Sequence, residues 1–69
     1  MATTQFFEKT LVDRGDKNKR MELEFGRSSF YGGENLMYLQ VDGKLLILDR
    51  DTMHELFAAM ERLADYLGR

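Results

Sequence analysis

The dipeptide Asp42-Gly43 constrains the fold of this chain more than any other feature, because it fixes how two strands pair. Both central residues of a type I′ turn need a positive φ angle, which Gly and Asp tolerate. Strand-like apolar residues flank the dipeptide on both sides, so residues 35–41 and 44–48 are predicted to form an antiparallel hairpin. A two-residue turn also sets the pairing register of the two strands.

This register divides the hairpin into two faces, and both of them are apolar. The first face carries Met37, Leu39, Leu46 and Leu48. The second face carries Leu36, Tyr38, Leu45 and Ile47. Because neighbouring side chains of a strand point to opposite faces, a single helix can cover only one of these two sets.

The residues after the hairpin are predicted to form a helix from about residue 50 to residue 67. Apolar residues recur at intervals of three and four, which is typical of an amphipathic helix. Asp49 or Asp51 is the expected N-cap, Thr52 with Glu55 matches a capping box, and Gly68 suits the C-terminal end. The apolar stripe consists of Met53, Leu56, Phe57, Met60, Leu63, Ala64 and Leu67.

Two further strands are predicted before the hairpin, over residues 3–12 and 20–25. A polar turn joins them, and residues 26–33 form a Gly-rich loop. Adjacent Phe6 and Phe7 break the alternation of the first strand, so the pattern leaves open which of the two is buried. The sequence therefore predicts a single α+β domain over residues 1–69. Its order is β-β-β-β-α, with a four-stranded antiparallel sheet and one C-terminal helix packed on one face.

A chain of 69 residues buries only about 60% of its unfolded surface, so such domains usually need an additional source of stability. The chain has no cysteine and one histidine, which excludes a disulfide, a thiolate metal site and a His-rich zinc site. Oligomerisation remains, and we expect a homodimer, although another protein could cover the same surface. The expected interface is the second hairpin face with a neighbouring helix residue: Leu36, Tyr38, Leu45, Ile47 and Tyr66.

No combination of residues in the sequence predicts catalysis. A nucleophilic triad needs a histidine beside Ser or Cys and an acid, and His54 is better explained as a solvated helix residue. The carboxylates Glu22 and Glu24 are neighbours on one strand face, which is typical of a solvated strand face. We therefore expect no enzymatic activity, no cofactor and no metal site.

The alternative to a protein-interaction module is binding of single-stranded nucleic acid. A basic turn and an aromatic loop are one way to bind such strands, because bases stack on aromatic rings and phosphates attract cations. Against this alternative, Glu22 and Glu24 on the adjoining strand would repel phosphates. The candidate contact residues are Arg14, Lys17, Lys19, Arg20, Arg27, Phe30 and Tyr31.

Four strands followed by a helix, with a basic hairpin turn, are similar to the single-stranded-DNA-binding transcriptional coactivator family. The resemblance implies a dimer that binds strands with a basic, aromatic-bearing sheet. It rests on the order of elements and on this turn, and the net charge of −2 departs from it. No site residue is carried over from that family.

The chain is not expected to associate with a membrane. Its longest apolar run, residues 45–48, is far shorter than the roughly 20 residues that a spanning helix needs. The first residues lack the basic and apolar regions of a signal peptide. Together with the lack of cysteine, this leads us to expect a cytoplasmic protein.

Overall fold

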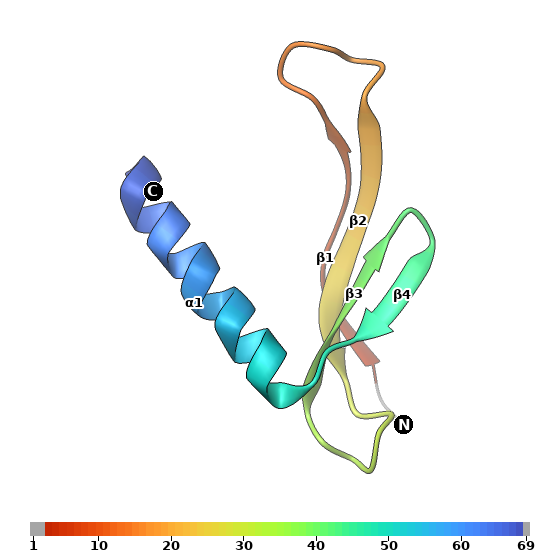
Figure 1. Ribbon diagram of the computed structural model, residues 1–69. Coiled ribbons are helices and arrows are strands. Elements are labelled where there is room, and N and C mark those ends of the chain that lie inside the picture. The colour runs from red at the N-terminus through yellow and green to blue at the C-terminus, as the bar shows by residue number, and fades with distance from the viewer. Residues whose placement is uncertain (1–2, 69) are drawn as a thin grey trace.

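The computed structural model describes residues 3–68 and has the predicted α+β architecture (Figure 1). A four-stranded antiparallel sheet, in the sequential order β1-β2-β3-β4, is followed by one helix. The predicted fold class is therefore confirmed. The elements are β1 (Thr3–Val12), β2 (Arg20–Ser28), β3 (Leu36–Val41), β4 (Lys44–Ile47) and α1 (Arg50–Leu67).

The turn between β3 and β4 has the predicted geometry. Asp42 and Gly43 both have positive φ angles, of 50° and 83°. The resulting register pairs Tyr38 with Ile47 and Gln40 with Leu45, as the two-residue turn requires. The turn is also tied to β2, because the amide of Asp42 donates to the carbonyl of Glu22 at 3.0 Å. In return, the Glu22 amide donates to Oδ1 of Asp42 at 2.9 Å.

Strand β2 continues to Ser28, so the prediction that residues 26–28 belong to a loop is wrong. Arg27 and Ser28 pair with β1 on one side and with β3 on the other. Gly26 lies where β1 passes unusually close, since a Cβ built on it would lie 2.0 Å from the carbonyl oxygen of Thr4. A glycine, which usually weakens a strand, is therefore required here by the approach of the neighbouring backbone.

The two adjacent phenylalanines of β1 lie at an irregularity in the pairing. Gln5 pairs with Gly26 and Phe7 with Phe25, so Phe6 is an extra residue of the kind that forms a β-bulge. Phe7 stacks on Phe25, with ring centroids 5.2 Å apart. Phe6 lines a cavity together with the same Phe25. The bulge thus brings both phenylalanines to one side of the sheet, which accounts for the broken alternation.

Strands β1 and β2 extend beyond β3 as a two-stranded arm. β3 pairs with β2 only from residue 23 onward, so residues 10–12 and 20–22 have one neighbouring strand. The polar turn at the tip of this arm is closed by Asp13, whose Oδ2 accepts hydrogen bonds from the amides of Gly15 and Asp16, both at 3.0 Å.

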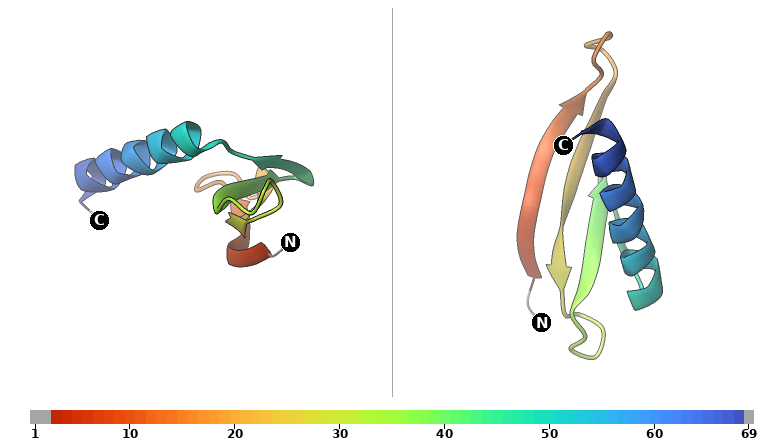
Figure 2. Two further views of the ribbon diagram at one scale, coloured as in Figure 1. Left: turned by 90° about the horizontal axis from the view of Figure 1, so that it is seen from below. Right: turned by 90° about the vertical axis from the view of Figure 1, so that its left-hand side faces the viewer.

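Helix α1 begins after a connection of only two residues, Leu48 and Asp49. The amide of Leu48 donates to the carbonyl of Met37 at 2.9 Å, and Oδ1 of Asp49 caps the helix by accepting from the Thr52 amide at 2.8 Å. Gly68 ends the helix in the left-handed conformation, with φ 76°. From this fixed start, α1 runs away from the sheet at an angle, and its main contacts are with β3 (Figures 1 and 2).

This arrangement buries little apolar surface. Among residues 3–68 the buried apolar side chains are Leu36, Tyr38 and Met53. The chain exposes 5740 Å², whereas a compact monomer of this size exposes about 4,500 Å². Its radius of gyration is 13.9 Å, against about 11 Å for a compact domain of this length. The single chain is therefore an open, angular body.

Candidate interaction surface

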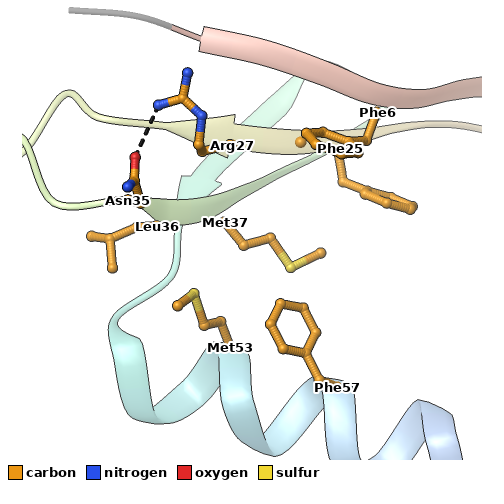
Figure 3. A pocket seen from close by; sticks show the side chains of 9 residues that line it. Phe6, Phe25, Arg27, Asn35, Leu36, Met37, Met53 and Phe57 are labelled. Carbon is orange, nitrogen blue, oxygen red and sulfur yellow. Dashed lines mark hydrogen bonds between the residues drawn. The ribbon is translucent and has the colours of Figure 1, made fainter.

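An apolar cavity of about 300 Å³ lies in the angle between α1 and the sheet (Figure 3). Met53 and Phe57 of α1 face Met37 of β3 across it (Figure 3). The apolar side chains in its wall are Phe6, Phe25, Leu36, Met37, Met53 and Phe57. These side chains come from β1, β2, β3 and α1, so the cavity exists only because the helix starts where β3 begins.

The apolar stripe of α1 is exposed over most of its length. Met53 is buried, but Phe57 is 49% exposed, Met60 60% and Leu67 70%. The expectation that this stripe packs along the sheet is therefore wrong beyond the first turns of the helix. The physical reason is the short connection after β4, whose hydrogen bonds direct the helix away from the sheet.

The side of the sheet that lines the cavity is also partly uncovered. We call it the cavity face, and the pairing register assigns to it Phe7, Met21, Leu23, Phe25, Met37, Leu39 and Leu46. This is the face that the sequence predicts for the helix, but Met21 and Leu46 remain 43% and 57% exposed. The register also places Lys9, Arg27 and Lys44 on this face, so its charges within the strands are all positive.

The predicted interface on the other hairpin face does not form an uncovered patch. Leu36 and Tyr38 are only 6% and 4% exposed, which corrects the expectation that they need a partner. Leu36 belongs to the cavity wall, and the hydroxyl of Tyr38 donates to Oε2 of Glu24 at 2.6 Å. Leu45 is exposed and Ile47 half-buried. Tyr66, 86% exposed, lies on α1 and outside this face.

The Tyr38–Glu24 hydrogen bond has an electrostatic consequence. It raises the pKa of Tyr38 to about 12, because the bond to Glu24 needs the phenol proton, with burial and the negative charge of Glu24 adding to the effect. Glu24 is therefore a hydrogen-bonded carboxylate, and the prediction that it is simply solvated is wrong. Its pairing partner on β1, Glu8, is exposed.

The residues expected to bind nucleic acid fall into two groups at opposite ends of β2. Arg14, Lys17 and Lys19 lie in the turn before this strand, and Arg20 is its first residue. The loop with Phe30 and Tyr31 follows the strand (Figure 1). Phe30 and Tyr31 are exposed and contact each other edge to face, with centroids 5.0 Å apart.

Arg27 lies near the end of β2 that leads into this loop, and it donates to Oδ1 of Asn35 and to Oγ1 of Thr4 in β1, both at 3.0 Å. Because the nine residues of β2 separate the two groups, a single chain does not bring them together in one site.

Few of the described side chains have an arrangement that could support catalysis. His54 is exposed and packs edge to face on Phe57, with centroids 5.9 Å apart. Within residues 3–68, no three acidic or histidine side chains gather closely enough to hold a metal ion. Residues 3–68 contain no helix that is both long enough and apolar enough to cross a membrane.

No protein-family model, curated protein or solved structure matches this chain. The geometry of its own residues is therefore what bears on function. The sequence pattern did not predict the cavity. The adjacent Phe6 and Phe7 did indicate an irregularity in the first strand, and Phe6 at this bulge lines the cavity.

Proposed function

We propose that this chain is a non-enzymatic interaction module that acts as a homodimer. The supporting observation is its surplus surface, about 1,200 Å² more than a compact monomer of this size exposes. A stable interface buries about 800 Å² on each partner. A second copy could therefore remove most of the surplus from water, and apolar burial is the main favourable term in such association.

The surface in the angle between α1 and the sheet is the best-supported interface. It joins the exposed stripe of α1 to the uncovered part of the cavity face, so it is apolar and continuous around the cavity. Exposed apolar surface of this extent, rimmed by charged residues, is typical of protein interaction sites. By contrast, the second hairpin face offers only Leu45 and the half-buried Ile47, since Leu36 and Tyr38 are already buried.

Static light scattering with a matched pair of variants tests this proposal. Leu63→Lys places a charge in the exposed stripe, whereas Ala58→Lys places the same charge on the opposite side of α1. We expect the wild type and Ala58→Lys to be dimers at tens of micromolar. We expect Leu63→Lys to dissociate at least 30-fold more readily, which corresponds to the roughly 2 kcal/mol of an interface hot spot.

Circular dichroism checks that both variants keep their helix content. A wild type that is monomeric at tens of micromolar would rule out the dimer. Equal dissociation constants for the two variants would rule out the stripe of α1 as the interface.

A second candidate function, electrostatic binding of single-stranded nucleic acid, is supported by one observation. Four basic side chains, Arg14, Lys17, Lys19 and Arg20, are all exposed near the tip of the arm. Binding of a labelled oligonucleotide should then weaken steeply with salt. Lys17→Glu should weaken it further, whereas Arg62→Glu on the polar side of α1 should not. An absence of binding at low salt would exclude this function.

A further inference from the structure

We infer that the cavity between α1 and the sheet is filled by the second half of α1 from a second copy of this chain, including Leu63 and Leu67. This inference rests on the proposed homodimer and specifies how it is built. Each copy would lay its exposed helical stripe over the cavity face of the other. The cavity would then be a binding site for two partner side chains.

The second half of α1 is held away from the cavity face of its own chain. Asp49 caps α1 and Leu48 is hydrogen-bonded to Met37, so the two-residue connection has little freedom to change direction. Met53, one turn later, is already buried at the cavity wall. The residues beyond Phe57 therefore leave along a line that departs from the sheet (Figure 1). Their apolar side chains are available to a different copy.

The size and lining of the cavity suit aliphatic side chains. An apolar cavity of about 150 Å³ takes one benzene molecule. This cavity, at about 300 Å³, has room for two groups of that size, such as the ends of two leucines. Its wall is mainly Phe, Met and Leu, and methionine adapts readily to an inserted apolar group.

The charges around the two surfaces are complementary. Lys9 and Lys44 are exposed on the cavity face. Beside the helical stripe, at 100° per residue, lies Glu61. A partner helix seated on the cavity face would bring this acidic residue toward the basic ones. Complementarity of this kind favours correct partners and fixes their register.

Two-fold symmetry covers both the helical stripe and the cavity face in one dimer. In an isologous dimer, a contact from residue i to residue j is repeated from j to i. The stripe of each helix and the cavity face of each sheet are therefore covered in the same pair. No helical stripe is left for a third copy, so the assembly closes as a dimer and does not continue as a filament.

Nuclear magnetic resonance on a mixed dimer tests the inference with the wild-type protein. One sample of the chain is deuterated except for its ¹³C-labelled methionine methyl groups, and an equal amount of unlabelled, protonated chain is added and allowed to exchange. We expect Overhauser contacts from the labelled methyls of Met37 and Met53 to leucine methyls of the unlabelled copy. Met37→Leu and Met53→Leu assign the two methionine signals. Met21 lies on the same face near the tip of the arm but does not line the cavity, so its contacts should be weaker.

Light scattering on the same sample separates the possible failures. A dimer without these intermolecular contacts would overturn the inference and leave the proposed homodimer in place. A monomer would overturn both. Contacts that are absent from the mixed dimer but present in a fully protonated sample would show that the chain's own helix closes on the sheet, and would also overturn the inference. Loss of the contacts in Leu63→Lys, but not in Ala58→Lys, would support it.

Discussion

The close approach of β1 to Gly26 leads to a strong prediction about stability. Replacing this glycine by alanine places a methyl group 2.0 Å from the carbonyl oxygen of Thr4, well inside van der Waals contact. The same methyl would lie 3.0 Å from Cα of Gln5 and from the amide nitrogen of Phe6. All three atoms are backbone, so no side chain can rotate away. The N-terminal part of β1 must move off the sheet.

The cost follows from what this movement breaks. Each ladder hydrogen bond contributes about 0.5–1.5 kcal/mol, and we expect about two of them to be lost between residues 3–5 and β2. The Phe7–Phe25 stack, next to the bulge, contributes about 0.5–1.5 kcal/mol beyond its buried area. Gly26→Ala should therefore destabilise the protein by about 2–4 kcal/mol, a large part of the stability of a small domain.

Urea denaturation followed by circular dichroism measures this effect, with Gly15→Ala as the matched control. At Gly15 a Cβ meets only the Asp13 carboxylate, at 3.8 Å, so the control should be neutral or slightly stabilising. Gly26→Ala should lower the urea midpoint by about 2 M or abolish the transition. Both variants must be compared at one protein concentration, because dimer stability depends on it. Equal midpoints for the two variants would refute the pairing of β1 with β2 described here.

Three further predictions concern local interactions. In the wild type, the Tyr38–Glu24 hydrogen bond raises the pKa of Tyr38 to about 12, so it stabilises the fold below pH 10 and this stabilisation is lost as the pH rises toward 12. Tyr38→Phe lacks the hydrogen bond and this pH dependence. The urea midpoints of wild type and variant should therefore converge near pH 12. Hydrogen bonds from Thr52 lower the pKa of Asp49 below its usual 3.8, so this carboxylate stabilises α1 above that pH and ceases to do so in stronger acid. In Asp49→Asn the helical circular dichroism signal should therefore fall less on acidification than in the wild type. Gly43→Ala, at a φ angle of 83°, should cost about 1–2 kcal/mol in urea denaturation, and an unchanged midpoint would contradict the turn geometry.

Local rules were sufficient to predict the elements and the β3–β4 register. Asp42-Gly43 has one favourable way to reverse the chain, so the pairing of Tyr38 with Ile47 followed from the turn alone. Helix α1 was predicted with its observed bounds, since Asp49 and Gly68 are strong caps at the two ends of a regular apolar stripe.

The relation between elements could not be predicted in the same way. The direction of α1 depends on backbone hydrogen bonds of Leu48, and every residue type donates such bonds. The extension of β2 to Ser28 depends on the close passage of β1 at Gly26, whereas glycine in a sequence more often indicates a loop. Leu36 was assigned correctly to its hairpin face, but the same residue also reaches the cavity wall. Its burial therefore depends on where the helix starts.

The bulge at Phe6 also bears on how this protein avoids aggregation. β1 is a ten-residue edge strand, and a long, regular edge can pair with strands of other chains into fibres. An extra residue in the strand interrupts the row of edge hydrogen-bonding groups, and Lys9 adds an exposed charge on the same strand. The opposite edge, β4, has only four residues. Both open margins of the sheet are thus poor templates for strand addition, which leaves association to the apolar side chains on its face.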